Sequence, residues 1–428
     1  MSDKKKVLEK FLKDNRVLIV DKNPGSRNRL IKIICDLGAK LKYVHATSRF
    51  AEAVEIVETE KISLVLSDYF VDGGSGFDLF KILRERKPEN KNMCFVLVTS
   101  NISQTAVAKA AEEDVDAFVV KPYTIEAIQD YLMNAVFDKV QPSEYSIKID
   151  QAKNLMTEGE LDKALLVLRD AVSNSKKPSL ALFYIGQIEY MRNMTTKAQQ
   201  AYDEGLSVSR IHFKCLFGLY DLYMREKKHK NAYKIAKKIT KYYPANPERL
   251  TQVIRLAIQT ENYQDMQTYY EVFTTLEERP AILTNYIGAG LYVSGKHFIK
   301  RDKYEEAIKC FDSIGVSCSE STKLIRGLIT VLCEHSHAVD AEKFLLRFSA
   351  GSRDHEDYLV SEYLVWAGKG ASLSFLVKNG LELYNKNIRD VLCMKTLVNA
   401  MEQSGYKQEK IDEFRNEINV LWPEEPSV

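Results

Sequence analysis

The chain has 428 residues, of which 28% are charged and 45% hydrophobic, and its formal net charge is +2. This length suits two or three globular domains with sizeable cores. The nearly neutral charge argues against a dedicated nucleic-acid-binding protein, because phosphate contacts demand a basic excess. The basic start lacks the apolar core of a secretory signal, and no later run is apolar enough to span a membrane. We therefore expect a cytoplasmic protein whose partners are proteins.

The first third of the chain alternates between two kinds of segment. Short, continuous apolar runs predict strands buried on both faces of a parallel sheet; they are RVLIVD (16–21), SLVLSD (63–68), CFVLVTS (94–100) and AFVVKP (117–122). Between and after them, apolar residues recur at helical spacing; these segments are 26–38, 48–60, 76–86, 105–116 and 124–137. About five βα units of this kind predict an α/β doubly wound sheet of five parallel strands.

Polar residues stand where these strands end. The four are Asp21, Asp68, Thr99 and Lys121. Because the carboxyl ends of parallel strands meet at one edge of a sheet, we expect the four side chains to form a site there.

The same segments resemble the receiver domain of two-component response regulators, the CheY-like fold, over residues 14–137. The pieces that carry the resemblance follow in order at the family's spacing; they are LIVD, LVLSDYFVDGGSGFDL, VLVTS and FVVKPY. A CheY-like receiver is therefore expected over 14–137, with a linker over 138–143.

The resemblance implies a role for each site residue. Asp68 would accept a phosphoryl group, and Mg²⁺ would be held by Asp21, Asp68 and the backbone carbonyl of Phe70. Lys121, before an expected cis Lys121–Pro122 bond, would pair with the acyl phosphate. Two residues would act as the switch, Thr99 by bonding the phosphoryl oxygens and Phe118 by changing rotamer with it.

Elementary chemistry supports this set of side chains. A carboxylate that attacks a phosphoryl group needs positive charge to offset the crowding of negative oxygens, and catalysis is mainly positioning plus electrostatics. Taken alone, each of these residues has a common structural explanation without a catalytic role; an Asp after a strand, for example, often forms a turn. The four together favour phosphoryl transfer.

Two positions depart from the family pattern. Lys22 stands where receivers carry a second metal-binding acid, and Asp72 replaces a proline after the acceptor. We expect Mg²⁺ binding to be weak or absent. The Lys22 ammonium either takes the place of the metal beside the carboxylates or turns outward on its flexible stem.

The remainder of the chain predicts helices with a repeat. Small residues recur at one constant step, from Ala164 to Ala198 to Ala232 and again from Ala307 to Ala341. A helical hairpin that repeats at this step, about 34 residues, with small residues at these positions resembles the tetratricopeptide repeat. We expect such repeats over 144–350, and divergent repeats or a terminal cap over 351–428. Because the step from Ala232 to Ala307 exceeds two periods by about two helical turns, we expect one lengthened helix between them.

Repeat arrays of this kind bind proteins or peptides on an extended surface. On the family frame, the groove positions are Phe183, Tyr190, Phe217, Asp221 and Arg255. Some of these aromatic residues could equally pack between repeats.

Two functions follow from these features, and neither is enzymatic. One is a response regulator, phosphorylated on Asp68 by a sensor histidine kinase or a phosphotransfer protein, whose phosphorylation modulates partner binding by the repeats. The other is an adaptor that works without phosphorylation, which Lys22 favours. The expected partners are that kinase and a protein or peptide in the groove, without membrane or nucleic acid; a homodimer through the receiver stays open.

Overall fold

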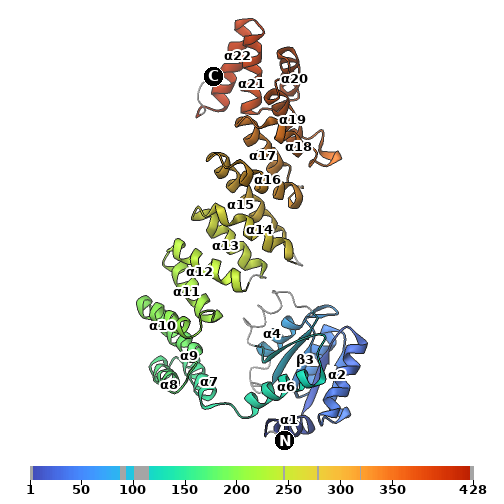
Figure 1. Cartoon of the computed structure of the whole chain (residues 1–428), viewed down its shortest axis with the longest axis vertical. Helices are drawn as coiled ribbons and strands as arrows, with labels where there is room; N and C mark the ends of the chain where they lie inside the picture. The colour runs from blue at the N-terminus through green and yellow to red at the C-terminus, as the bar shows by residue number, and fades with distance from the viewer. Residues whose placement is uncertain are drawn as a thin grey trace. The chain divides into compact units, whose positions relative to one another are not determined.

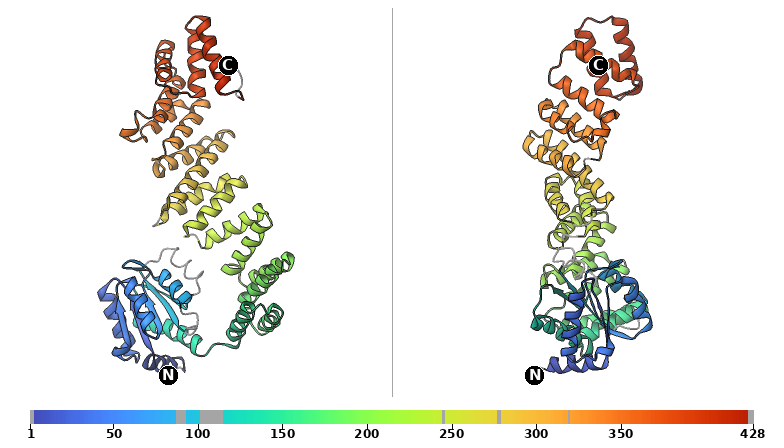
Figure 2. Two further views of the ribbon diagram at one scale, coloured as in Figure 1. Left: turned by 180° about the vertical axis from the view of Figure 1, so that it is seen from behind. Right: turned by 90° about the vertical axis from the view of Figure 1, so that its right-hand side faces the viewer.

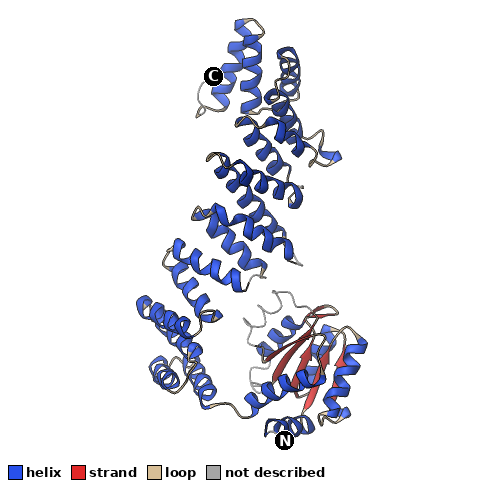
Figure 3. Cartoon of the chain, viewed as in Figure 1, coloured by secondary structure: helices blue, strands red, loops and turns tan. Residues whose placement is uncertain are grey.

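The computed structural model describes residues 3–86, 93–100, 115–243, 246–276, 279–318 and 320–424. Two compact units make up the chain, residues 1–249 and 250–428. The first unit contains a five-stranded sheet and the first helical hairpins, and the second is helical in its described residues (Figures 1 and 3). The expected helix over 105–116 falls mostly outside the described residues.

The sheet has five parallel strands in the order β2-β1-β3-β6-β7. Their bounds are β1 Arg16–Val20, β2 Val44–Thr47, β3 Ile62–Ser67, β6 Cys94–Thr99 and β7 Ala117–Val120. The described helices around it are α1 Asp3–Asp14, α2 Pro24–Asp36, α3 Phe50–Thr59, α4 Gly76–Arg86 and α6 Ile125–Val140, with the short pair β4 Phe70–Val71 and β5 Gly74–Ser75. The predicted doubly wound parallel fold is confirmed.

Helix α1 was not predicted. It precedes β1 and packs against α6, and its apolar side chains Leu8 and Leu12 are fully buried. They belong to the core on one face of the sheet, together with Ile128 and Leu132 of α6. At the surface, the Lys4 ammonium donates a hydrogen bond of 2.7 Å to Asn134. The basic start of the chain is therefore an amphipathic helix of the sheet domain.

Helical hairpins follow the break at 141–143. Their paired helices, in the described part of the chain, are α7 Glu144–Thr157 with α8 Leu161–Ser173, α9 Ser179–Met191 with α10 Thr195–Val208, α11 Phe213–Arg225 with α12 His229–Tyr242, α13 Pro247–Gln259 with α14 Met266–Thr275, α15 Ala281–Ile299 with α16 Tyr304–Ser317, α17 Thr322–Glu334 with α18 Ala338–Leu345, α19 Glu356–Gly368 with α20 Leu373–Asn385, and α21 Val391–Gln403 with α22 Gln408–Leu421. Within each unit, Figure 2 shows successive hairpins stacked on one another. The predicted helical-repeat region is confirmed.

The small residues of the repeat lie inside the helix pairs. Ala164, Ala198 and Ala232 have no exposed surface, as do Ala307 and Ala341. The predicted insertion is also confirmed, because α15 has 19 residues where α9, α11, α13 and α17 have 13.

The turn inside each hairpin has a shared geometry that the sequence analysis missed. One residue per turn has a positive φ, and these residues are Gly159, Asn193, Lys227, Glu261, Asp302, Ser336, Gly370 and Gly405. The residue after each donates its amide to a carbonyl five residues back, as Met194 does to Glu189 at 2.8 Å. This left-handed cap with its 6→1 bond is the Schellman motif. It reverses the chain at each hairpin whether or not the residue is glycine.

We expect Gly370→Ala to destabilise the protein by about 1–2 kcal/mol. Gly370 has φ +79°, and a β-carbon there meets no atom within 4 Å, so the cost is purely conformational. Gly351→Ala is the matched control, because Gly351 has equal space without a left-handed backbone. Urea unfolding of the full chain measures both. Equal stability of the two variants would contradict this account of the turn.

Candidate functional site

Three charged side chains meet at the carboxyl edge of the sheet. Asp21 follows β1, Asp68 follows β3 and Lys121 follows β7. Because β1 and β3 are neighbours in the sheet, the two carboxylates leave adjacent strand ends. Asp21 is 1% exposed and Asp68 7%. The predicted set is thus brought together, and its acids are buried.

The Lys121 ammonium bridges the two carboxylates. Its Nζ lies 2.5 Å from Asp21 Oδ2 and 2.7 Å from Asp68 Oδ2. Burial disfavours the charged ammonium, but hydrogen bonds and charges from both acids outweigh it and raise the pKa of Lys121 above its usual value. The ammonium is therefore held in the charged form between the two acids.

The Asp21 carboxylate has further partners from the loop into α2. Ser26 donates its hydroxyl to Asp21 Oδ2 at 2.6 Å, and the Asn23 amide donates to Oδ1 at 2.8 Å. The Arg27 guanidinium also donates to the backbone carbonyl of Asp21 at 2.5 Å. Sequence reasoning missed Ser26 and Arg27, although their positions in the first turn of a helix after a strand are a usable signal.

The Asp68 side chain is held by the backbone around it. The backbone amide of Asp68 donates to the Val20 carbonyl at 2.7 Å, and the side-chain Oδ1 of Asp68 accepts the Tyr69 amide at 2.6 Å. Gly76 packs directly on this segment, where a β-carbon would lie 2.3 Å from the Asp68 carbonyl oxygen. Glycine is therefore required at position 76 for the chain to pass the Asp68 backbone.

Of the two predicted switch residues, Thr99 lies beside this group, and Phe118 packs against the apolar core on one face of the sheet. Thr99 ends β6, is 1% exposed, and accepts the Lys121 amide on its carbonyl at 2.8 Å. Phe118 on β7 is half-buried and pairs with Leu97 of β6. The Lys121–Pro122 peptide bond is cis, as predicted.

Lys22 points away from the carboxylates. Its side chain is exposed, and its ammonium lies 5.8 Å from the centre of the Phe70 ring. The ring itself is 36% exposed and stacks edgewise on Tyr69 at 4.6 Å. Of the two arrangements expected for Lys22, the structure has the outward one, and Lys121 supplies the positive charge beside the acids.

The residues present fit a magnesium ion with a reduced set of ligands. Asp21, Asp68 and the Phe70 carbonyl offer oxygen donors, and Mg²⁺ is commonly held by one or two carboxylates plus water and phosphate oxygens. Across the described ranges, no group of three or more His, Cys, Asp or Glu side chains could hold a metal ion. The second acid that would enlarge the set is replaced by Lys22.

The five predicted groove residues do not lie together. Phe183 is 8% exposed and packs on Tyr202, with ring centres 6.1 Å apart, so it belongs to the repeat core. Arg255 is exposed on α13 and lies in the second unit. The other three lie on the first helices of successive hairpins, Tyr190 on α9 with Phe217 and Asp221 on α11.

Tyr190, Phe217 and Asp221 are half-buried and carry cationic neighbours. The Arg225 guanidinium lies 4.7 Å from the Tyr190 ring centre, and that of Arg249 lies 5.3 Å from the Phe217 ring centre. Burial raises the pKa of the Asp221 carboxyl to about 6, although the charge of Arg249 lowers it. This group combines aromatic surface with both signs of charge.

Comparison with known proteins assigns the sheet domain to a family. Residues 17–133 match the family described as response regulator receiver domain. The chemotaxis protein CheY-3 of Vibrio cholerae serotype O1 is 23% identical over 128 residues, which are 30% of this chain and 95% of that protein. The chemotaxis protein CheY of Pseudomonas aeruginosa is 22% identical over 29% of this chain and 98% of its own. The sheet domain is a receiver domain of the two-component signalling family.

Two solved structures are similar to separate parts of the chain. The BeF3 activated DrrB receiver domain is 19% identical and covers 28% of this chain and 97% of its own, with a TM-score of 0.25. A tetratricopeptide repeat protein from Parabacteroides merdae is 19% identical and covers 63% of this chain and 96% of its own, with a TM-score of 0.30. None of the helices in the described ranges combines the length and apolar character that a membrane span requires.

We expect Lys121→Met to destabilise the receiver by about 3 kcal/mol, because it leaves two buried carboxylates without a counter-charge. Adding Asp68→Asn to this variant removes one of the two charges and restores part of the loss. Urea unfolding of the full chain, followed by circular dichroism, compares the single and double variants. If Lys121→Met is as stable as the parent, the ammonium does not offset the acids.

Proposed function

We propose that this protein is a response regulator in which phosphorylation of Asp68 by a sensor histidine kinase or phosphotransfer protein changes partner binding by the helical repeats. The observation that carries the proposal is the Lys121 ammonium, hydrogen-bonded to both buried carboxylates at 2.5 and 2.7 Å. A charged lysine in this position is what a carboxylate needs to accept a phosphoryl group.

The chemistry is a phosphoryl transfer between two protein side chains. An Asp68 oxygen forms a bond to phosphorus while the bond between phosphorus and the donor's histidine nitrogen breaks, and the imidazole leaves with that electron pair. Lys121 stays paired with the new acyl phosphate, and the Thr99 hydroxyl bonds its oxygens. Mg²⁺ held by Asp21, Asp68 and the Phe70 carbonyl would add positive charge on the transferring oxygens.

A second candidate is an adaptor that binds its partners without phosphorylation. The exposed Lys22, at the position of the missing acid, supports it because the metal set is smaller there. The two candidates differ in whether Asp68 becomes labelled.

Labelling with a small phosphodonor separates them. The full protein, incubated with acetyl phosphate and Mg²⁺, should gain the mass of one phosphoryl group by intact-mass spectrometry, and Asp68→Asn should gain none. Because Lys22 reduces the ligand set, we expect slow labelling in the parent. Lys22→Asp should bind Mg²⁺ at least tenfold more tightly and label faster.

Two of the possible results select one candidate each, and a third tests the role of Lys22. Labelling that is lost in Asp68→Asn supports the response regulator. No labelling in either the parent or Lys22→Asp favours the adaptor. Equal, rapid labelling of the parent and Lys22→Asp would contradict the role given to Lys22.

The partner surface we propose is the group of Tyr190, Phe217 and Asp221. Replacing both aromatic residues by alanine should abolish capture of a protein that the full chain binds, because buried aromatic anchors contribute much of the energy of such interfaces. Phe375→Ala with Tyr406→Ala is the matched control, since these rings are 40% and 44% exposed on other repeats.

Melting temperature measured alongside shows that the variants are folded. If capture survives loss of Tyr190 and Phe217, the partner uses another surface, such as the receiver face or the lysine-rich helix α12.

A further inference from the structure

The second helix of the third hairpin, α12, differs in charge from its counterparts. It contains five lysines and no acidic residue. The second helix of each other hairpin described above contains at least one Asp or Glu. The hairpin of α11 and α12, residues 213–243, has nine Lys or Arg residues and two acids, in a chain whose net charge is only +2. Positive charge is therefore concentrated on this hairpin, and above all on α12.

The five lysines form a row along one face of α12. Residues three or four apart lie on the same side of a helix; the lysines with this spacing are Lys230, Lys234, Lys237, Lys238 and Lys241. All are exposed except the half-buried Lys238. The small and apolar side chains of α12, such as Ala232 and Ile239, are buried. The row, about 16 Å long from the rise of a helix, therefore lies on the outer side of its hairpin.

Much of this row lacks partners within the chain. On another second helix, α18, the Lys343 ammonium lies 3.6 Å from a carboxylate oxygen of Asp312, whereas across the described ranges Lys230, Lys234 and Lys238 form no such pair. Lysines four residues apart repel one another, and α12 has such neighbours along the whole row. An anionic partner would offset this repulsion.

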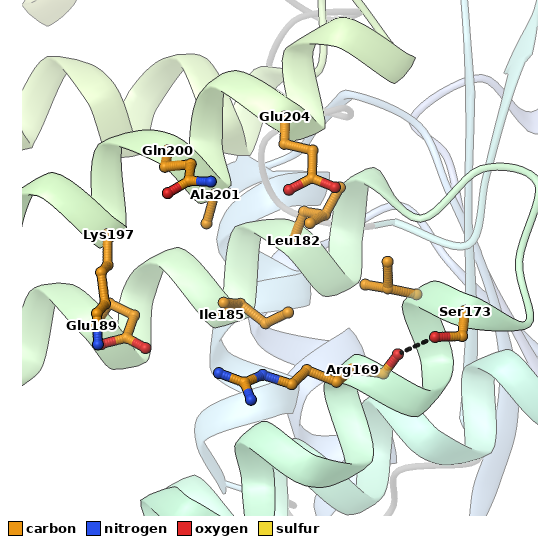
Figure 4. A pocket seen from close by; sticks show the side chains of 10 residues that line it. Arg169, Ser173, Leu182, Ile185, Glu189, Lys197, Gln200, Ala201 and Glu204 are labelled. Atoms are coloured by element: carbon orange, nitrogen blue, oxygen red, sulfur yellow. Dashed lines mark hydrogen bonds between the residues drawn. The ribbon is translucent and has the colours of Figure 1, made fainter.

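The row is narrow, because the second helix of the preceding hairpin is not basic at the same positions. One repeat earlier, on α10, the residues that correspond to Lys234 and Lys238 are Gln200 and Glu204, and Asp203 precedes the latter. All three α10 residues are exposed. Figure 4 shows the Gln200 and Glu204 side chains along α10. A flat membrane or a wide duplex would meet these acids as well as the lysines, whereas a linear polyanion along α12 would meet mainly lysines.

The side chains of α12 favour an acidic polypeptide among linear polyanions. Single-stranded nucleic acid is usually held by cations together with aromatic rings on which the bases stack. The exposed ring of α12 is Tyr242 at its end, 46% exposed, while Tyr233 is buried. A helix with an acid on each turn repeats its carboxylates at about 5.4 Å, which is close to the spacing of the lysines.

We propose that α12 binds an acidic helical segment of a partner protein, which lies alongside the row with its carboxylates against the lysines. This surface is separate from the group of Tyr190, Phe217 and Asp221, because that group lies on the first helices of its hairpins. Binding at α12 therefore needs neither that group nor phosphorylation of Asp68, and it can be tested on the unlabelled protein.

Fluorescence anisotropy of the full chain tests the proposal with a fluorescein-labelled, alanine-based helical peptide that carries one glutamate per turn on one face. This peptide should bind, more weakly as salt is added, and the same peptide with glutamine in place of glutamate should not. Lys230→Gln, Lys234→Gln and Lys241→Gln together should weaken binding at least tenfold. The matched control makes the same charge change on other second helices and should bind like the parent; its substitutions are Lys163→Gln, Lys343→Gln and Lys378→Gln.

Thermal melting gives a second readout. The α12 triple variant should melt above the parent, because it removes the repulsion between lysines four residues apart and glutamine has nearly the helix propensity of lysine. A lower melting temperature would mean that the row stabilises the fold itself.

That result would overturn the proposal, and so would three others. They are an absence of peptide binding by the parent, equal loss of binding in the two triple variants, and tighter binding of a single-stranded oligothymidylate or of phosphatidylserine vesicles than of the glutamate peptide. The last would assign the row to phosphate groups rather than to a protein.

Discussion

The buried charge at the edge of the sheet constrains the rest of the receiver domain. Two nearly inaccessible acidic side chains meet there, and the Lys121 ammonium, within hydrogen-bond distance of both, supplies the counter-charge that buried acids require. That geometry requires three strand ends in fixed register, and the β1, β3, β6 and β7 pairings provide it. It also requires loops that approach the acids closely, which is why Gly76 has no room for a side chain and why Ser26 faces Asp21. Any group that joins this site must share these oxygens with the ammonium.

The repeat region depends on a different constraint, the turn inside each hairpin. Its left-handed residue recurs at one constant step from Gly159 to Glu261, and at the same step again from Asp302 to Gly370. The step from Glu261 to Asp302 is longer, and the extra length is absorbed in the first helix of that hairpin, α15. Adding whole helical turns preserves the face that α15 presents to its neighbours, because two turns of helix are about seven residues. An insertion of another length would rotate the apolar face away from the core.

Much of this arrangement could be predicted from the sequence, for reasons that are visible at particular residues. The central strands are buried on both faces, so they read as unbroken apolar runs, and the polar residue after each run marks the site. Strand β2 lies at the sheet edge and is half-exposed, so its sequence has no such apolar run.

Helix α1 was not predicted because only two of its residues, Leu8 and Leu12, are fully buried, and many of the others are lysines. The direction of Lys22 could not be decided, since a long side chain with several rotatable bonds reaches both the acids and the Phe70 ring.

The Tyr202 ring couples two successive hairpins of the repeat region, a feature that the spacing of the alanines does not predict. The ring fills the space at both Gly186 of α9 and Gly218 of α11, where a β-carbon would lie 2.4 and 2.6 Å from ring atoms. One side chain on α10 is thus wedged between the first helices of two successive hairpins. Opening either hairpin would expose this ring and leave a void against the other helix. The second hairpin and α11 therefore form one cooperative unit of local unfolding, in an array whose repeats would otherwise fray one at a time from the ends.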